Sequence, residues 1–514
     1  MKLNNSIVKL MPDLRTHFRK LIDNLTGTDN TNLKTQLIYG IFWNFISAMA
    51  SQGFPLIATI VAARLLGTAG YGQLTMISST VVLFSTFAGL GLGITSTKYI
   101  AQYHLTEPNR TGRIMGLTNL FGIVSGSLMC SILFIMSPWI ATNMLATPYL
   151  APTLRIASIL LIFNTIVGIQ SGSIAGFGAF KDLAKIAIFQ GIISASLTIT
   201  GVYFFGLTGA IVAMVINSII NAILYKLSIN NLIKRFKIKI DYLKSWQEKD
   251  IIWKLSFPSM LSSIMVGPVM WIANIIIINN PDGYSQLGIF NAAYQWKTML
   301  AFVPTVIGGV LLPLVAANIN NENKNLEVVN VLASWIIVIV IALPLLAFPE
   351  IIAYFYGEGY SSTIFLQSIS AMMLVSCILA YKEGIARKLI AKNLMWWGFL
   401  SNLVWGILFL VSIMIFQSLG ALGLSLSYII SYSINTIIFV PFYISRKVVP
   451  LELLVSKEVI IIWFVLIIQT SMSLLNIKIG IRFLTLTISI GILALVFYRI
   501  IKINRANNRK TKSV

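Results

Sequence analysis

The sequence predicts an all-α integral membrane protein with about fourteen transmembrane helices. Hydrophobic residues make up 57% of the 514-residue chain and charged residues only 11%, less than half of the roughly 25% found in soluble globular proteins. So little charge cannot coat a water-soluble particle, which excludes a cytosolic enzyme, a nucleic-acid-binding domain and a secreted disulfide scaffold. The net charge of +22 instead indicates basic residues retained in the cytoplasmic loops of a membrane protein.

Fourteen apolar runs are long enough to cross the hydrocarbon core, which takes about 20 helical residues. In chain order, the runs cover 36–62, 73–96, 114–138, 153–177, 186–206, 208–228, 255–279, 286–317, 328–348, 363–381, 393–416, 420–444, 458–477 and 482–501. Lysine and arginine gather in alternate connections and in both tails. By the positive-inside rule both termini are then cytoplasmic, which requires an even number of spans.

Two short motifs indicate that the first six spans are duplicated as the next six. Residues 70–74 read GYGQL and residues 283–287 read GYSQL, and the same spacing relates Pro55 to Pro268. Six is an even number, so both copies enter the membrane in the same sense, as two pseudo-symmetric lobes around an axis along the membrane normal. The working cavity of such a protein lies between its lobes, and this architecture is typical of a transporter.

The predicted organisation has five parts. They are an amphipathic cytoplasmic tail (1–33), a first lobe (34–228), a basic interfacial loop (229–253), a second lobe (254–445) and two further spans with a basic cytoplasmic tail (446–514). Apolar residues recur at helical spacing among the basic residues of the tail and the loop. We therefore expect helices that lie in the membrane interface, with an ordinary solvated linker as the alternative.

No motif of enzyme or cofactor chemistry is present. Cys130 and Cys377 lie far apart in apolar runs, and the two histidines are His17 and His104. The sequence contains no HExxH, CxxC, GxSxG or P-loop pattern. We expect no metal, no cofactor and no catalytic residues.

The charged residues favour an anionic substrate. All sixteen acidic residues fall in tails, loops or span ends by the predicted boundaries, whereas cation-driven drug exporters need a buried carboxylate. Lys297 lies in the middle of the eighth run, where a charge costs about 2.5–3.5 kcal/mol. Without a carboxylate partner it either loses its proton or faces a wet cavity that supplies anions. We predict the cavity, with snorkelling to the membrane boundary as the alternative.

Polar residues on the first, seventh and eighth runs line up with this lysine. The predicted substrate-binding residues of the cavity are Lys297, Asn291, Tyr294, Gln295, Asn44, Gln52, Trp271 and Asn274. Small polar residues in membrane helices more often serve helix packing, but their presence on all three runs favours a ligand-lined passage. Arg64 and Lys98, at opposite ends of the first hairpin, are candidate entrance cations, and snorkelling explains both equally well.

Elementary physics suggests which anion such a passage carries. A phosphate headgroup in bare hydrocarbon meets a penalty of tens of kcal/mol, and a wet cationic passage removes most of it. A cytoplasm-negative potential drives anions outward by about 2.3 kcal/mol per charge per 100 mV. A pyrophosphate-bearing lipid that leaves the cytoplasmic leaflet therefore moves downhill electrically.

Three segments resemble a known family. Residues 62–103 read AARLLGTAGYGQLTMISSTVVLFSTFAGLGLGITSTKYIAQY, which is similar to the first hairpin of bacterial polysaccharide-unit flippases. These belong to the multidrug/oligosaccharidyl-lipid/polysaccharide exporter superfamily. Residues 287–316 (LGIFNAAYQWKTMLAFVPTVIGGVLLPLVA) and 354–360 (YFYGEGY) resemble further family segments. Members of this family have cationic residues in the cavity, and Lys297 is the best candidate for such a residue in this sequence. No fixed sequence motif assigns it that role.

The resemblance implies a drug-exporter-like fold and a flippase rather than an enzyme. Its substrate would be undecaprenyl-pyrophosphate-linked oligosaccharide units, moved from the cytoplasmic to the outer leaflet of the bacterial inner membrane. These units are then used for O-antigen, capsule or exopolysaccharide. The implied partners are the lipid-linked substrate, membrane lipids, and a polysaccharide polymerase with its chain-length machinery, with no nucleic acid and no cofactor.

Other hypotheses compete with this one. A multidrug exporter on the same fold is disfavoured by the missing carboxylates, whereas a peptidoglycan-precursor flippase carries a similar anionic lipid and stays open. A membrane-embedded polymerase or ligase needs a large outside loop with catalytic residues. The longest outside connections, 139–152 and 349–362, are short and contain no His, Lys or Arg, which argues against the enzyme.

Overall fold

The computed structural model describes a bundle of long helices. It covers residues 31–511 except 258–259, 261–264, 318–323 and 393, and the described part contains helices and connections but no strand. The predicted all-α fold is confirmed. The interfacial helix predicted in the N-terminal tail lies outside the described residues.

The described residues of the first half of the chain form five α-helices. They are α2 (Thr31–Gly89), α3 (Leu92–Tyr103), α4 (Pro108–Trp139), α5 (Ala151–Gly176) and α6 (Phe180–Arg235). Two of them, α2 and α6, are bent at Gly67 (φ 67°) and Gly206 (φ 54°), left-handed conformations that glycine adopts without steric cost. Gly67 lies between two predicted runs, and Gly206 is the last residue of the run 186–206. The second predicted run is itself interrupted, because the backbone of Leu90 and Gly91 also has positive φ between α2 and α3.

The second half is divided more finely. Its helices are α8 (Val266–Ile278), α9 (Gly283–Leu300), α10 (Phe302–Ala317), α11 (Lys324–Ala347), α12 (Glu350–Tyr356), α13 (Thr363–Ala391), α14 (Met395–Phe416), α15 (Gly420–Ser445), α16 (Leu451–Val455), α17 (Lys457–Leu474) and α18 (Ile479–Thr511). The predicted run 286–317 forms two helices, α9 and α10. Pro304 explains the break. It has no backbone N–H to donate to the carbonyl of Leu300, and its ring would collide with that carbonyl in a continuous helix.

One boundary prediction is wrong in a way that matters for the site. We expected a span over 363–381 followed by a basic loop, but α13 continues to Ala391. The continuation is possible because its charged residues find partners on neighbouring helices. Lys388, for example, lies 2.5 Å from a carboxylate oxygen of Glu327. Glu383 consequently lies on a membrane-length helix rather than in a loop.

The structure forms no continuous helix over 229–253, where we expected an interfacial helix with a solvated linker as the alternative. The first residues of this segment are the end of α6, and turns and a short 3₁₀ helix (Ser245–Glu248) follow. The buried Glu248 holds this connection against α4, accepting hydrogen bonds from Arg110 (3.2 Å) and Arg113 (2.9 Å). Tertiary ion pairs, rather than an amphipathic stripe, therefore determine the path of the chain.

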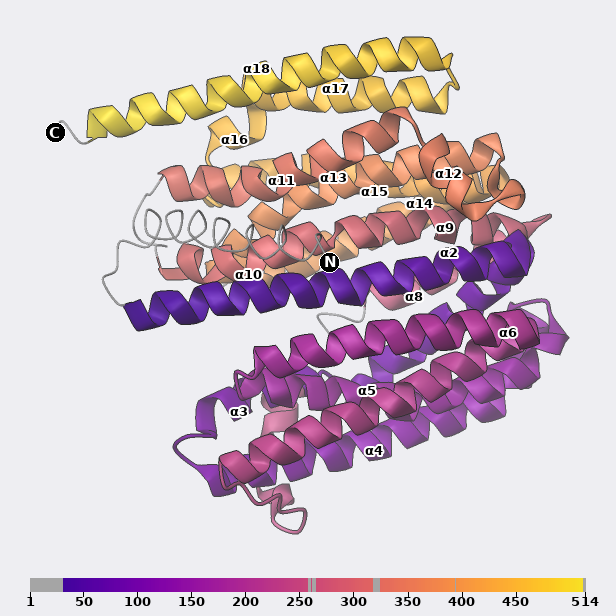
Figure 1. The fold of residues 1–514 in the computed structure, drawn as a ribbon, viewed down its shortest axis with the longest axis vertical. Helices are drawn as coiled ribbons and strands as arrows, with labels where there is room; N and C mark the ends of the chain where they lie inside the picture. Colours follow the sequence, from indigo (N-terminus) through magenta and orange to yellow (C-terminus); the bar gives the residue numbers. More distant parts are fainter. Residues whose placement is uncertain (1–30, 258–259, 261–264, 318–323, 393, 512–514) are drawn as a thin grey trace, which may run out of the picture.

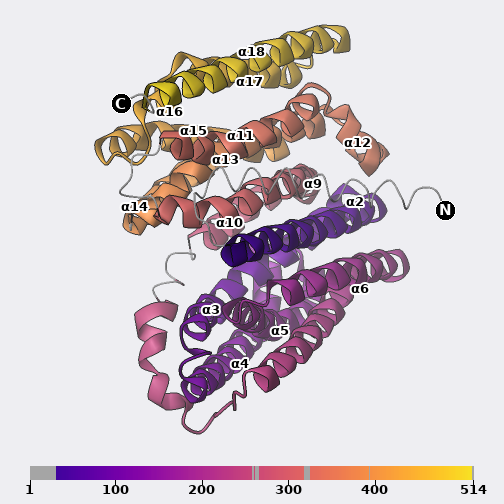
Figure 2. The ribbon, with the colours of Figure 1, turned by 60° about the vertical axis from the view of Figure 1, so that its left-hand side comes forward.

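Figures 1 and 2 show how the helices are arranged. The group of α3, α4, α5 and α6 lies on one side of α2, and α9 to α15 lie on its other side. The pair α17 and α18 forms the edge farthest from α4. Eight described helical segments are long and apolar enough to cross a membrane, and some contain two predicted runs. The division into lobes and the count of fourteen stay predictions.

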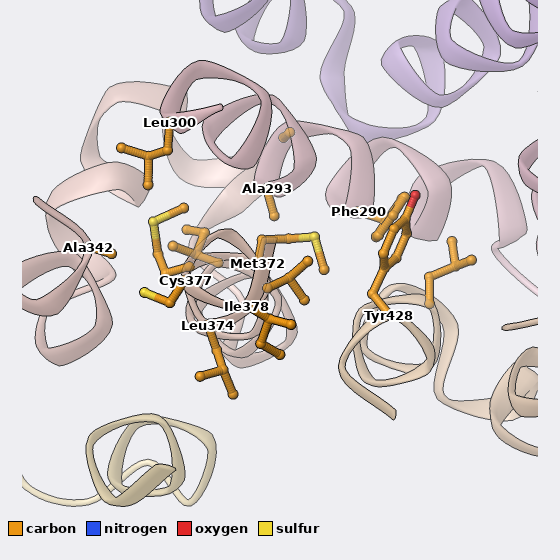
Figure 3. Close-up of a cluster of buried hydrophobic side chains, with 14 of the residues drawn as sticks. Phe290, Ala293, Leu300, Ala342, Met372, Leu374, Cys377, Ile378 and Tyr428 are labelled. Carbon is orange, nitrogen blue, oxygen red and sulfur yellow. The ribbon is translucent and has the colours of Figure 1, made fainter. Parts of the chain in front are cut away.

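The core of the second half surrounds α13, the most deeply buried of the membrane-length helices described. Figure 3 shows Met372, Cys377 and Ile378 around this helix, with Phe290 of α9 beside Tyr428 of α15. These side chains belong to one buried apolar cluster. The helices α9, α13 and α15 therefore share one packed interior, and Lys297 lies on α9.

Candidate substrate site

Lys297 is enclosed by protein. Its side chain is 9% exposed, and its Nζ atom lies 3.9 Å from the ring centre of Tyr294 and 5.3 Å from that of Tyr428. Within the described residues, no carboxylate oxygen lies within 4.0 Å of this ammonium group. Cation–π contacts are worth about 0.5–2 kcal/mol each. They stabilise the charge without neutralising it.

Helical spacing explains why these groups meet. Phe290, Tyr294 and Lys297 are four and three residues apart, so they form one stripe along α9. The stripe faces α15, where Tyr428 lies 5.9 Å from both Phe290 and Tyr294 between ring centres. The lysine therefore points into the interior between α9 and α15.

A second stripe of α9 faces α2 instead. Asn291 donates a hydrogen bond to the hydroxyl of Tyr71 (3.1 Å), and Gln295 also lies beside that hydroxyl. On the preceding helix α8, the indole of Trp271 donates to Thr80 of α2 (3.0 Å). The structure thus places Asn291, Gln295 and Trp271 together along the seam with α2. It places Tyr294 and Lys297 on the other side of α9.

The two copies of the repeated motif meet in this seam. Ser285 donates a hydrogen bond to Thr68 (2.7 Å), and a Cβ atom on Gly72 would collide with the carbonyl oxygen of Tyr284. Gly288 approaches the carbonyl of Thr68 in the same way. The glycines allow backbone-to-backbone packing of α2 against α9.

Three more predicted residues lie near this seam or along α2. Asn274 of α8 is 4% exposed, and its side-chain oxygen has no hydrogen-bond partner among the described residues. Gln52 is half-buried on α2. Asn44 belongs to the same helix, but its side chain lies outside the described part of the chain. An unpartnered buried amide oxygen leaves Asn274 able to accept a hydrogen bond from a ligand or water.

Both candidate entrance cations are exposed. Arg64 lies on α2 against the backbone of Gly357, in the turn after α12. Lys98 lies on α3, with its Nζ atom 5.5 Å from the ring centre of Tyr99. Exposed side chains are expected both for entrance cations and for snorkelling residues. The entrance role of these two residues therefore stays a prediction.

Sequence reasoning missed Lys382 and Arg387, because both were assigned to a loop. Lys382 of α13 donates to the side-chain oxygen of Asn435 on α15 (2.5 Å). Arg387 is 3% exposed and donates to Asn330 of α11 (2.8 Å). Apolar residues continue at helical spacing through KEGIARKLIA, 382–391, and this signal could have extended the helix.

Two hollows in the structure lie away from these residues. One of about 90 Å³ is lined by Ser85, Asn164 and Thr165 between α2 and α5. Another of about 550 Å³ lies between the two arms of α6, beside Phe204 and Phe205. Neither is lined by the predicted site residues. In the described residues, no three His, Cys, Asp or Glu side chains lie together as a metal site would need.

Comparison with known protein families identifies the family of this chain. A family model described as "Polysaccharide biosynthesis protein" matches residues 37–319, more than half of the chain. The chain belongs to the polysaccharide biosynthesis protein family. The match includes every predicted site residue and ends before Lys382.

Two curated relatives of this polysaccharide biosynthesis protein are exporters or flippases by name. It is 20% identical over 394 residues to the EPS I polysaccharide export inner membrane protein EpsE of Ralstonia solanacearum, covering 74% of this chain and 88% of the relative. It is 23% identical over 298 residues to the Lipid III flippase of Escherichia coli (strain K12), covering 56% of this chain and 69% of the flippase.

Solved structures share the fold of this polysaccharide biosynthesis protein. The lipid II flippase MurJ in an inward closed conformation aligns with a TM-score of 0.65 at 17% identity, covering 90% of this chain and 99% of MurJ. An inward-facing multidrug resistance MATE family transporter of the MOP superfamily aligns with a TM-score of 0.64 at 14% identity, covering 79% and 98%. The drug-exporter-like membrane fold predicted from sequence is confirmed.

Proposed function

We propose that this protein is a flippase for lipid-linked oligosaccharide. It moves undecaprenyl-pyrophosphate-linked units from the cytoplasmic to the outer leaflet of the inner membrane, where they supply O-antigen, capsule or exopolysaccharide. The family match, the export and flippase relatives and the transporter fold support this proposal. The same comparisons favour a transporter over an enzyme.

The observation that carries the proposal is the buried ammonium of Lys297. A cation held at 9% exposure without a carboxylate partner among the described residues is an incomplete ion pair, and an anionic ligand completes it. Its aromatic neighbours Tyr294 and Tyr428 stabilise the charge without neutralising it. A diphosphate headgroup offers oxygen acceptors that form stronger, charge-assisted hydrogen bonds.

Transport then follows from alternating access. Rocking of two groups of helices opens a wet passage to one side at a time. In this proposal the passage includes the polar seam of Asn291 and Trp271 with α2 and reaches Lys297 on the other side of α9. The headgroup turns over inside this passage while the polyprenyl chain stays in lipid. The membrane potential drives each negative charge outward by about 2.3 kcal/mol per 100 mV.

The orientation follows from the basic residues. Both tails and the connection after α6 are rich in lysine and arginine, which supports cytoplasmic termini. An inner-membrane location is supported by the exporter relative, which is named an inner membrane protein. The transported units are the material for a polymerase and its chain-length machinery, and these are the proposed functional partners.

A peptidoglycan-precursor flippase is the second candidate, because its substrate carries the same anionic headgroup chemistry. The two candidates differ in what stops when the gene is deleted. Loss of a polysaccharide-unit flippase leaves cell-wall growth intact and removes surface polymer. Loss of a peptidoglycan-precursor flippase arrests wall synthesis.

The experiment follows the lipid-linked units in a deletion strain. We expect the units to accumulate in membranes of spheroplasts and to resist an impermeant periodate reagent that oxidises outward-facing sugars. Restoring the gene should return surface polymer and make the units accessible. A deletion strain with normal surface polymer and accessible units would reject the proposed function.

A further inference from the structure

Lys382 is a second cation inside the same group of helices. It lies on α13, half-buried, with its Nζ atom 5.4 Å from the ring centre of Tyr432 and 2.5 Å from the side-chain oxygen of Asn435. In the described part of the chain, no carboxylate oxygen lies within 4.0 Å of it. The next residue, Glu383, is exposed. Lys382 therefore resembles Lys297 in having aromatic and neutral neighbours but no ion pair.

Other buried cations in the second half are accounted for by structural partners. Lys388 pairs with Glu327 (2.5 Å). The guanidinium of Arg387 donates hydrogen bonds to neutral groups. Its acceptors are the side chain and the carbonyl of Asn330 and the hydroxyl of Ser334. These bonds tie α13 to α11 and leave little capacity for a ligand. Lys382 has one hydrogen bond to Asn435 and three donors in all.

One face of α15 lies between the two lysines. Tyr428, Tyr432 and Asn435 are four and three residues apart, and the two tyrosine rings stack with centres 6.0 Å apart. Lys297 contacts Tyr428 from α9, and Lys382 contacts Tyr432 and Asn435 from α13. Because an α-helix rises about 1.5 Å per residue, Lys382 lies roughly one to two turns nearer the C-terminal end of α15. This end is cytoplasmic in the proposed orientation.

Asn435 positions the second lysine. It is fully buried, and its side chain both accepts from the Ser401 hydroxyl (3.1 Å) and donates to the Ser401 carbonyl (2.8 Å). The amide is therefore fixed in orientation, with its oxygen towards Lys382. An aspartate at this position would have nearly the same shape and would neutralise the lysine.

We propose that Lys297 and Lys382 together form a binding site for a diphosphate group, one lysine at each end of the Tyr428–Tyr432 stack. A diphosphate diester carries two negative charges, one on each phosphate, and the site holds two ammonium groups without carboxylate partners in the described structure. In this site Lys382 lies at the cytoplasmic end of the diphosphate and Lys297 lies deeper in the membrane. This inference rests on the proposed function and names the part of the substrate that is bound.

The test measures binding to the full-length protein in lipid nanodiscs. Farnesyl diphosphate, inorganic diphosphate and farnesol are titrated, and binding is followed by isothermal titration calorimetry. Lys382→Gln and Lys297→Gln should each weaken farnesyl diphosphate about ten-fold, the loss expected for one charge-assisted hydrogen bond. Lys382→Arg should retain most of the affinity. Lys234→Gln, at an exposed position, is the matched control and should leave the affinity unchanged.

Three further arms identify what is recognised and guard against misfolding. If the phosphates alone are recognised, the affinity for inorganic diphosphate should fall in both lysine variants as it does for farnesyl diphosphate. The binding of farnesol should be the same in the variants as in the wild type. Asn435→Asp should weaken farnesyl diphosphate as much as Lys382→Gln while keeping the lysine. If Lys382→Gln cannot be recovered from the membrane, the affinity of Asn435→Asp tests the role of Lys382 in its place.

The outcomes separate this inference from the proposed function. Wild-type affinity in Lys382→Gln or Asn435→Asp, alongside a ten-fold loss in Lys297→Gln, overturns the two-lysine site and leaves the flippase standing. A deletion strain with normal surface polymer rejects the flippase, whatever the binding constants. Loss of binding in both lysine variants, with the Lys234→Gln control intact, supports the site.

Discussion

At the scale of single residues, the central feature is a charge held by aromatic rings. The ammonium of Lys297 lies over Tyr294 and Tyr428, and these rings pack in turn against Phe290 and Tyr432. Each cation–π contact in such a cluster stabilises the ammonium group by about 0.5–2 kcal/mol. In the proposed function, the phosphates of the substrate are stronger partners for this ammonium group than the rings are.

Replacing Lys297 tests the role of its charge in transport. Lys297→Ala should lower surface polymer about ten-fold or more at unchanged protein level, because one charge-assisted contact worth about 1.5–3 kcal/mol is lost. Lys297→Arg should keep part of the activity, since the charge remains. The measurement is polymer per cell with the protein quantified in the same membranes, and normal polymer from the alanine variant would contradict the assignment.

Replacing Tyr428 separates the ring from its hydroxyl. Tyr428→Leu should lower the free energy of unfolding by about 2–4 kcal/mol, through the lost cation–π contact and the reduced packing. Tyr428→Phe keeps the ring and should cost clearly less. Thermal unfolding in detergent, followed by tryptophan fluorescence, compares the two, and equal midpoints would show that the ring does not stabilise the lysine.

The sequence alone named the candidate residues of the site, and their role stays a prediction. Lys297 was singled out because a charge in mid-membrane is costly, and helical spacing grouped Asn291, Tyr294 and Gln295 with it. The structure places only Tyr294 of these three on the same side of α9 as Lys297. The sequence could not tell which face of α9 meets which neighbour, because that depends on the packing of α2 and α15. Lys382 was missed for a different reason: charged residues usually mark the end of a span, and here the helix continues past them.

At the scale of helices, the seam between α2 and α9 is the closest approach we identify between the two halves. Its hydrogen bonds and small residues let the backbones touch at Gly72 and Gly288. The repeated motif predicted a duplication, but it could not predict that its two copies would pack against each other. Alternating access requires this seam to part.

A cross-link across the seam tests that requirement. The hydroxyl oxygens of Thr68 and Ser285 are 2.7 Å apart, so cysteines at these two positions would lie side by side across the seam. Thr68→Cys with Ser285→Cys, in a chain whose two native cysteines are alanine, should cross-link on oxidation and stop transport. Reduction should restore it. Full transport by the oxidised, quantitatively cross-linked protein would mean that α2 and α9 do not separate.

The connection after α6 offers a test of element stability. Glu248 bridges Arg110 and Arg113 while 8% of its side chain is exposed. Glu248→Gln should weaken this attachment by about 1–2 kcal/mol, between the values for surface and buried ion pairs. Faster trypsin cleavage at the exposed Lys244 and Lys249 would reveal the loosened connection, and an unchanged cleavage rate would show that the ion pairs do not hold it.

At the scale of the whole molecule, composition was sufficient to predict a helical membrane protein, and this is confirmed. Boundaries were less predictable, because α13 extends beyond its apolar run and α9 ends at Leu300, four residues before Pro304. Hydropathy measures only the average affinity of a segment for lipid, whereas tertiary partners decide where each helix ends. The two lobes with two added helices stay a prediction, consistent with the order of helices in Figure 1.

The most direct measurement follows one lipid in reconstituted vesicles. Purified protein is placed in liposomes that carry a fluorescent polyprenyl-diphosphate oligosaccharide, and its appearance in the opposite leaflet is timed under an imposed membrane potential. We predict protein-dependent movement of the lipid that is faster when the potential drives its two negative charges across, and that is about ten-fold slower with Lys297→Ala. Equally fast movement of a matching lipid without phosphate, or movement indifferent to the potential and to Lys297, would contradict it.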